Sequence, residues 1–352
     1  MELNLKQKYT SLLDAHLPNR PIFDSTGAFL KSELELLDPT LHLPLTWTTF
    51  AEDLLPREGL SIDDEFASWT NSTYGSAGSF STTGKSWLGV EAQDSADVGI
   101  DIRKAVNEIG IWSKSASWTF VELSRSQKLQ RPIDVDKLQA IQNIWNLDVD
   151  NQAYLGDVNK GLFGLANADT ASGNTADWAV TNSTNAITGG WVALLASSPS
   201  TAANLILNDL NALDNSIYTN SGWTSPATKF LVPASVWYVL NVPLVIAGVP
   251  IAMSIKDYFE QHSIAATQGR KIQILPRKWL ASSIPGTNYG NNLSANRVVG
   301  YTDDYDYIRM EYTPLLHTPV WIQGMRQSVT YYGGLGGVEI LRPATLGYLN
   351  QV

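Results

Sequence analysis

The clearest helical pattern in the chain lies in residues 132–156. Its apolar positions recur at spacings of three and four residues, which places them on one face of a helix, and polar side chains fill the other face. The apolar positions are Leu138, Ile141, Trp145 and Val149. The pattern therefore predicts one long amphipathic helix with a buried stripe.

Both ends of this helix carry local signals. Asp134 is suited to be the N-cap, because its carboxylate can accept a free backbone N–H of the first turn. Gly156 is the expected stop, since glycine adopts the left-handed conformation without a Cβ penalty. Gly161 and Gly164 then predict a tight turn directly after the helix.

A second helix is predicted after a polar loop at residues 169–190. Ser198 followed by Pro199 is a start signal, because proline suits the first helical turn. The predicted apolar stripe consists of Ile206, Leu210, Leu213 and Ile217. We expect this helix to end near Gly222.

Strand patterns flank the two helices. Before the long helix, residues 70–92 are rich in Ser, Thr and Gly and predict a loop, which strands at Val98–Val106 and Ala116–Leu123 follow. After the second helix, strands and short helices alternate. The predicted elements there are a strand at Lys229–Val232, a short helix at Ala234–Leu240, a helix capped by Ser254, and strands at Lys271–Leu275, Arg297–Tyr312, Met325–Tyr332 and Gly337–Leu341.

Residues 1–60 lack the pattern of a compact unit. Prolines divide this stretch into short pieces with leucines between them, which is typical of an extended segment that lies on another surface. The prolines are Pro18, Pro21, Pro39, Pro44 and Pro56. The first residues also lack the apolar run of a signal peptide.

Several motifs, in their order along the chain, resemble one protein family. Leu155-Gly156-Asp157 closes the long helix, and Gly-Leu-x-Gly-Leu-x-Asn follows at 161–167. Leu231-Val232-Pro233 and a final Gly-Gly-Val-x-Ile-x-Arg-Pro at 336–343 complete the series. This order is similar to that of the major capsid proteins of tailed bacteriophages, which share the Hong Kong 97-type shell fold.

The resemblance implies an α+β fold with four parts. They are an N-terminal arm (1–65), an extended loop (66–125), a peripheral domain with the long spine helix (126–222 and 321–352) and an axial domain (223–320). Residues 1–60 are expected to bury more apolar surface against neighbouring subunits than against their own, because their proline-spaced leucines cannot close a core alone. The family's large N-terminal scaffolding extension is expected to be absent.

The function implied is that of a major capsid protein. Copies would self-assemble as pentamers and hexamers into the icosahedral head shell, which encloses double-stranded DNA without sequence-specific binding. Portal, scaffolding and decoration proteins would be further partners, and the shell would assemble in the host cytoplasm and persist in the virion. An encapsulin-like compartment shell shares the fold and is an alternative.

Composition excludes several kinds of chemistry and adds one alternative function. The 352 residues suffice for a sizeable core and two lobes, and 24 Lys and Arg against 34 Asp and Glu offer no overall basic surface for nucleic acid. The absence of cysteine excludes disulfides, thiolate metal sites and a cysteine nucleophile. The 12 Trp and 14 Tyr suit large interfaces, but they also suit carbohydrate stacking, so a carbohydrate-binding or carbohydrate-active protein is a second alternative.

No catalytic, cofactor-binding or metal-binding residue is predicted, and the chain is not expected to be an enzyme. Gly84-Lys85-Ser86 is a poor phosphate loop, because Gly78 stands one residue too far away. The cluster Asp303, Asp304 and Asp306 lacks the glycine and the distal glutamate of a calcium loop, which favours a solvated turn. The histidines, which are not spaced as metal ligands, are His16, His42, His262 and His317.

A membrane span is also not expected. The stretch between Lys229 and Lys256 carries no charge and is long enough to span a bilayer, but three prolines interrupt it. They are Pro233, Pro243 and Pro250. A buried strand, a short helix and a loop explain the stretch better.

Overall fold

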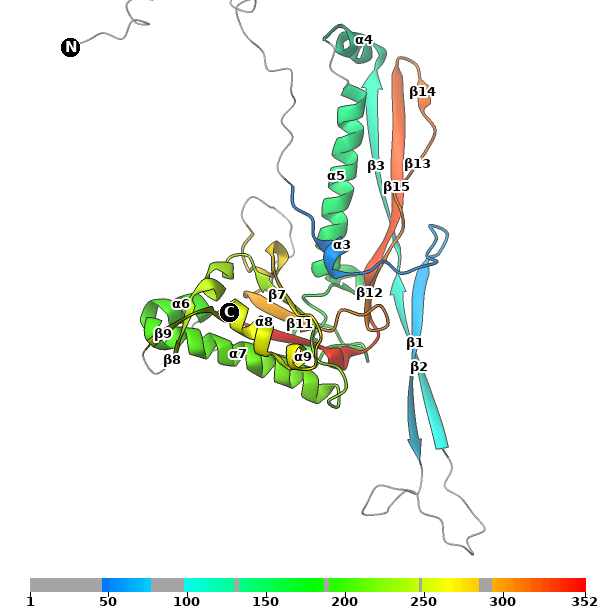
Figure 1. Cartoon of the computed structure of the whole chain (residues 1–352). Coiled ribbons are helices and arrows are strands. Elements are labelled where there is room, and N and C mark those ends of the chain that lie inside the picture. The colour runs from blue at the N-terminus through cyan, green and yellow to red at the C-terminus, as the bar shows by residue number, and fades with distance from the viewer. Residues whose placement is uncertain (1–45, 77–97, 130–132, 187–189, 247–248, 285–292) are drawn as a thin grey trace, which may run out of the picture. The chain divides into compact units, whose positions relative to one another are not determined.

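The computed structural model describes residues 46–76, 98–129, 133–186, 190–246, 249–284 and 293–352. These residues belong to the compact unit 46–352 and form an α+β fold with two main sheets. The sheet that contains strand β15 (Arg326–Ile340), with its helices, is called the spine lobe here. The sheet beside helix α7 (Pro199–Asn220), with its helices, is called the α7 lobe (Figure 1).

The spine lobe is organised around one long strand and one long helix. Strand β15 (Arg326–Ile340) pairs antiparallel with β3 (Gly110–Thr119), and helix α5 (Ile133–Tyr154) packs along both (Figure 1). Three short strands also pair with β15: β12 (Ile308–Tyr312), β13 (Leu316–His317) and β14 (Trp321–Gln323). Helix α4 (Phe120–Leu129) lies beside the start of α5 at the far end of this lobe.

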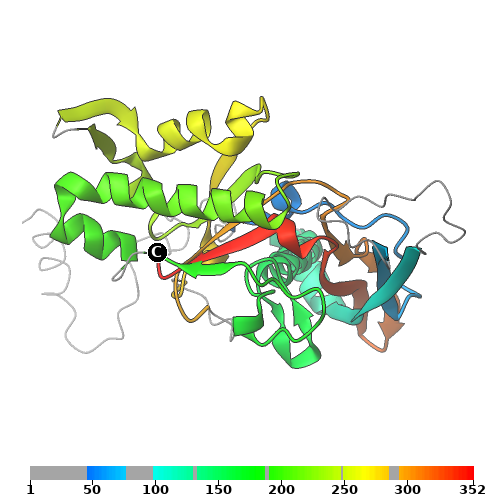
Figure 2. The ribbon, with the colours of Figure 1, turned by 90° about the horizontal axis from the view of Figure 1, so that it is seen from below.

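The α7 lobe contains a five-stranded sheet in the order β10-β7-β11-β16-β6. Helix α7 (Pro199–Asn220) lies against strands of this sheet, with further helices beside it (Figure 2). The strands are β10 (Gln273–Arg277), β7 (Lys229–Pro233), β11 (Arg297–Tyr301), β16 (Leu346–Asn350) and β6 (Ser183–Asn185). The remaining elements are α6 (Gly190–Ser197), α8 (Ile255–His262), α9 (Ile264–Thr267) and the hairpin β8 (Pro243–Ile246) with β9 (Val249–Ser254).

The two predicted helices form with the predicted faces inward. Ile141 and Trp145 are each 6% exposed, Val149 is fully buried, and all four residues of the α7 stripe are fully buried. Gly333 of β15 makes room for the Trp145 ring, since a Cβ there would lie 2.9 Å from the ring edge. Period-3.6 apolar spacing therefore predicted both core faces correctly.

The C-terminal end of α5 matches its sequence signals better than the N-terminal end. Gly156 and Gly161 both have positive φ, 62° and 70°, as expected of glycines that stop a helix and turn the chain. The helix begins at Ile133, so Asp134 lies in the first turn and the prediction that it is the N-cap is wrong. Residue preferences locate a helix start only to within one or two positions.

The loop after α5 satisfies the last carbonyls of that helix. The Ala166 N–H donates to the Tyr154 carbonyl at 2.8 Å. The Asn167 amide donates to the Leu155 carbonyl at 2.5 Å, and its oxygen accepts the Gly164 N–H at 2.8 Å. The Gly-Leu-x-Gly-Leu-x-Asn motif is therefore a capping device that folds back onto the helix end.

Strands β1 (Phe66–Ser76) and β2 (Val98–Glu108) form a two-stranded antiparallel pair, called the ribbon here. Figure 1 shows it leading away from both lobes. The loop predicted for residues 70–92 is wrong for 70–76, which are strand, and 77–92 lie outside the described residues. The pairing partner of β1 lies in a separate segment of the sequence, so Ser- and Thr-rich composition gave no sign of the strand.

The strand predicted to reach Leu123 ends at Thr119, where α4 begins. The Thr119 N–H donates to the Glu122 carboxylate at 2.9 Å, and the Glu122 N–H donates to the Thr119 hydroxyl at 3.2 Å. This reciprocal pair is a capping box, which starts a helix. The sequence contains the Thr-x-x-Glu signature of this capping box, but the alternating apolar and polar residues around it favoured the strand prediction.

Two further strand predictions differ from the structure. Arg297–Tyr312 is two strands in different sheets, β11 and β12, separated by a turn in which the Tyr307 N–H donates to the Asp304 carbonyl at 3.0 Å. Conversely, the strands predicted at Met325–Tyr332 and Gly337–Leu341 are one continuous strand, β15. Its glycine-rich middle stays extended because β3 and β12 supply pairing partners there.

Smaller differences lie near α7. Helix α6 occupies residues 190–197, which the sequence patterns left without a predicted helix. The short helix predicted at Ala234–Leu240 is a 3₁₀ helix at Trp237–Asn241. The helix capped by Ser254 is confirmed as α8, because the Ser254 hydroxyl accepts the Asp257 N–H at 3.1 Å.

The segment before β1 packs on its own subunit. It contains the short helix α3 (Phe50–Asp53), and Leu54 is only 2% exposed within the main core. The expectation that the arm lies on neighbours is therefore wrong for Leu54. The adjacent Asp53 explains why Leu54 is buried. Arg277 donates to both carboxylate oxygens of Asp53, at 2.5 and 2.7 Å, and keeps this part of the segment inside the subunit. Residues 1–45 lie outside the described part.

Candidate assembly surfaces

The ribbon leaves large apolar side chains in solvent. Ile100, Ile102 and Val106 share one face of β2 and are 67%, 68% and 49% exposed. Phe66 at the start of β1 is 61% exposed. Lys104 lies on the same face between Ile102 and Val106, so these side chains do not form one unbroken patch. Exposed apolar side chains that gather on one face are typical of an interaction site.

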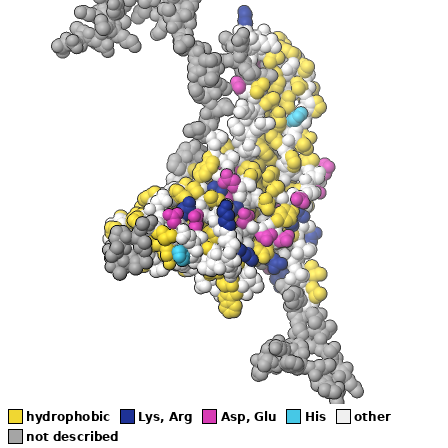
Figure 3. All heavy atoms as spheres, in the orientation of Figure 1, with side chains coloured by type: hydrophobic (Ala, Val, Ile, Leu, Met, Phe, Trp, Pro, Cys, Tyr) yellow, Lys and Arg dark blue, Asp and Glu magenta, His cyan; other side chains and the backbone are white. Residues whose placement is uncertain are grey.

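A second apolar surface, called the tip here, lies where α4 meets β14. The Phe120 N–H donates to the Met325 carbonyl at 3.1 Å, which joins the start of α4 to the turn between β14 and β15. The exposed side chains are Phe120, Val121, Trp321, Ile322 and Met325. Figure 3 shows hydrophobic side chains gathered at this end of the spine lobe.

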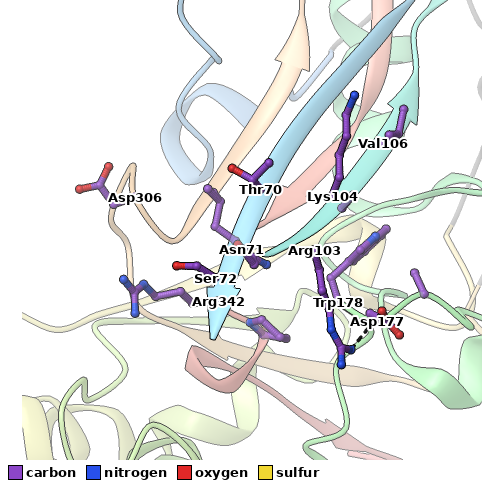
Figure 4. A pocket seen from close by; sticks show the side chains of 14 residues that line it. Thr70, Asn71, Ser72, Arg103, Lys104, Val106, Asp177, Trp178, Asp306 and Arg342 are labelled. Carbon is purple, nitrogen blue, oxygen red and sulfur yellow. Dashed lines mark hydrogen bonds and ion pairs between the residues drawn. The ribbon is translucent and has the colours of Figure 1, made fainter. Parts of the chain in front are cut away.

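A groove of about 810 Å³ lies between the ribbon and the body of the subunit (Figure 4). Thr70, Ser72 and Arg103 line its ribbon side, and residues 176–178 and 341–343 line the other. Arg103 reaches across at 3.2 Å to Asp177, the dashed contact in Figure 4. Both side chains are largely exposed, so solvent screens this ion pair and it contributes little to holding the ribbon in place.

Comparison with known proteins shows the family to which the chain belongs. A model of the family described as "Major capsid protein" matches residues 84–352. The chain belongs to the major capsid protein family. No curated protein sequence matches it.

Solved structures agree with this assignment. The capsid of Myoviridae phage XM1 superposes with a TM-score of 0.68 at 13% identity and covers 93% of this chain and 100% of that chain. The mature capsid of bacteriophage PhiM1 gives a TM-score of 0.55 at 11% identity, with 96% and 97% covered. The capsid of a native GTA particle gives 0.56 at 12%, with 90% and 96% covered. At these identities the likeness shows the fold alone, which is the predicted Hong Kong 97-type fold.

The predicted function is therefore confirmed at the level of the family. The chain is a major capsid protein and a component of the virion. Neither the encapsulin-like compartment nor the carbohydrate-active protein is supported by the family model or by these structures. Among the described residues no helix is long and apolar enough to cross a membrane.

The polar residues weighed for chemistry are scattered in this capsid protein. Asp303 forms an ion pair with Lys229 at 2.8 Å. The described residues contain no group of three or more potential metal ligands. His262 stacks on Tyr258, and His317 lies against Tyr331. The other candidates lie outside the described residues: His16, His42, Gly78, Gly84, Lys85 and Ser86.

A buried polar network anchors the segment before the ribbon. Asp150 of α5, fully buried, accepts the backbone N–H groups of Thr49 and Phe50 at 2.8 and 2.9 Å and the Trp279 indole N–H at 2.6 Å. Tyr154, one turn further along α5, donates to Asp53. Burial, and then the Asp53 carboxylate, raises the pKa of Tyr154, so this hydroxyl stays neutral and donates.

Sequence reasoning missed these anchoring residues. A buried aspartate is indistinguishable from a surface aspartate in one sequence, because the groups that satisfy Asp150 come from residues 49, 50 and 279. The apolar stripe gave no signal either, because one residue step turns the helix by about 100° and places Asp150 off the stripe.

Proposed function

We propose that copies of this chain assemble as pentamers and hexamers in which the ribbon of each subunit lies on a neighbour. The observation that carries this proposal is the exposed apolar face of β2, which nothing in the described part of the subunit covers. The tip would supply a second contact between copies. Symmetric closure repeats each contact around a ring, so individually weak contacts add up.

The same proposal assigns the four parts of the chain. Residues 1–65 form the arm, 66–125 the extended loop, 126–222 with 321–352 the peripheral domain and 223–320 the axial domain. The ribbon falls within the extended loop, and α5 with β15 falls within the peripheral domain, which supports these two assignments. The α7 lobe crosses the boundary between the peripheral and axial domains, because β6 and β16 share its sheet with β7, β10 and β11.

Partners beyond the chain itself follow from the role in a head. We infer that the shell encloses DNA without sequence-specific binding, in line with a net charge of −10 per copy, and that it meets portal, scaffolding and decoration proteins. Assembly takes place in the host cytoplasm. The family is one of structural proteins, which supports a role without catalysis.

Burial of the ribbon face would be the main stabilising term. Covering an Ile side chain completely contributes roughly 1.5–3 kcal/mol, before the cost of ordering the ribbon. Two isoleucines per subunit, Ile100 and Ile102, make this face decisive for ring closure.

A pair of double substitutions tests the proposal. Ile100→Asp with Ile102→Asp places charge on the face, whereas Ile100→Val with Ile102→Val keeps it apolar and serves as the matched control. We expect wild type and the valine variant to form shells in electron micrographs and the aspartate variant to stay as free subunits. All three should melt at nearly the same temperature, because both positions are exposed in the subunit.

Shells of normal yield from the aspartate variant would overturn the role of the ribbon. A wild type that never assembles at any concentration would overturn shell formation by this chain alone.

A further inference from the structure

Two buried carboxyl groups meet at the root of the ribbon. Glu311 of β12 and Glu339 of β15 are both fully buried. A Cβ at Gly336 would lie 2.7 Å from Glu311 Oε2 and 2.8 Å from its Cβ. Only glycine at this position leaves room for the Glu311 carboxyl group.

The charged groups around the pair come from several elements. Arg57, after α3, and Arg309, on β12, both donate to Glu339, and Arg57 also lies 3.6 Å from Glu311 Oε1. The same Arg57 guanidinium donates at 3.1 Å to the Ser68 carbonyl on β1. The cluster therefore joins the N-terminal segment and the ribbon to the spine lobe.

Glu311 contacts the ribbon on its other side. Asn107 of β2 is 4% exposed, and its side chain makes a hydrogen bond that favours the ionised form of Glu311. Asn107 also lies against Gly337, since a Cβ there would be 3.2 Å from the Asn107 amide nitrogen. Both strands of the ribbon thus touch the cluster, β1 through Ser68 and β2 through Asn107.

The hydrogen bonds around the two acids favour a shared proton. Glu311 Oε2 accepts the Gly337 N–H at 3.4 Å, whereas Oε1 accepts no hydrogen bond from the described residues and has Arg57 at 3.6 Å. Arg57 and Arg309 both donate to Glu339, so a second ionised carboxylate beside it would be repelled with only the longer Arg57 contact to offset this. Burial first, and Glu339 second, raise the pKa of Glu311 to about 9.

We propose that the Glu311–Glu339 pair is a proton-operated latch that fixes the root of the ribbon. With one proton shared between the two carboxyl groups, Glu311 hydrogen-bonds to Glu339, and the contacts to Arg57 and Asn107 hold both strands in place. When that proton leaves, the two carboxylates repel, the root opens, and the ribbon turns about it into the groove beside Trp178. That the ribbon then changes its fit on a neighbour rests on the proposed function.

The direction of the pH effect follows from the pKa. Glu311 binds its proton more tightly in the closed latch than in an open one, where the carboxyl group is solvated. Closure is therefore favoured at low pH, and its advantage is lost as the pH rises through about 9.

Hydrogen exchange on the unassembled full-length subunit tests the latch independently of shell formation. The readout is the ratio of exchange at the ribbon root, residues 66–69 and 105–108, to exchange in α5, residues 141–153. For wild type this ratio should rise about tenfold between about pH 8 and about pH 10. For Glu311→Gln, whose neutral amide still donates to Glu339, the ratio should stay constant.

Arg309→Lys serves as the matched control, because it keeps the charge beside Glu339 and leaves the titrating pair in place. It should show the wild-type rise. A constant ratio in wild type, or an equal rise in Glu311→Gln, would overturn the latch. If Glu311→Gln does not fold, the wild-type ratio decides alone, since α5 is its internal reference. Failure of wild type to form shells would leave this result unchanged.

Discussion

Gly164 lies directly against the end of α5, where no side chain fits. A Cβ there would lie 2.4 Å from the carbonyl carbon and oxygen of Tyr154, which are backbone atoms of a buried helix end. Gly161 differs in kind, because its φ is 70° and a Cβ there would meet nothing within 4 Å. Gly164 is required because a side chain would clash with the end of α5, and Gly161 is required because its backbone is left-handed.

The two alanine substitutions should therefore differ in cost. Gly164→Ala forces backbone apart, which overpacking data place at about 1–3 kcal/mol or more, and it also disturbs the cap on α5. Gly161→Ala incurs only the left-handed conformation, about 1–2 kcal/mol. Denaturant unfolding of free subunits would measure both, and an equal or larger loss in Gly161→Ala would contradict the contact argument.

Among the elements, the joint between α7 and α9 carries a buried carboxyl group. Asp214 of α7 is 1% exposed, and its Oδ2 accepts the Ile264 N–H at 2.9 Å at the start of α9. Its Oδ1 has no hydrogen-bond partner among the described residues. Burial raises the pKa of Asp214 to about 6, and the Ile264 N–H opposes this only in part.

Stability of this joint should depend on pH. The folded pKa lies above the ordinary value of 3.8, so the contribution of Asp214 is fully present below about pH 4 and is lost as the pH rises to about 6. Asp214→Asn does not titrate. Its free energy of unfolding relative to wild type should therefore increase by about 2–3 kcal/mol between about pH 4 and about pH 7.

Urea unfolding of both proteins at these two pH values measures the change. A difference between the proteins that is the same at both pH values would show that folding leaves the pKa of Asp214 unchanged.

At the scale of the whole molecule, apolar contacts between copies must outweigh the repulsion between their like net charges. Each copy carries a net charge of −10, so subunits in a shell repel one another. The ribbon and the tip are the surfaces on which apolar burial can offset this repulsion.

Salt should therefore promote assembly. At about 1 M NaCl the Debye length falls to about 3 Å, which screens repulsion between copies and leaves apolar burial intact. Light scattering should show the concentration needed for assembly falling as salt is raised from about 0.1 M. Dissociation of shells at high salt would instead show that ion pairs between copies hold them together.

The sequence alone determined the parts of this protein that depend on near neighbours in the chain. The stripes of α5 and α7, the glycine stop at Gly156 and the Ser254 cap each arise within a few residues, where side-chain spacing and backbone preference act directly. The order of such local motifs was also enough to identify the capsid family.

Only the tertiary structure decided the features that need a partner far away in the chain. Strand β1 exists because β2 pairs with it, Leu54 is buried because Asp53 meets Arg277, and Glu311 is buried near a second acid because β15 pairs with β12. Pairing and burial are properties of two segments at once, and the pattern within one segment does not contain the other. The ribbon and its latch, on which the proposed assembly depends, are of this second kind.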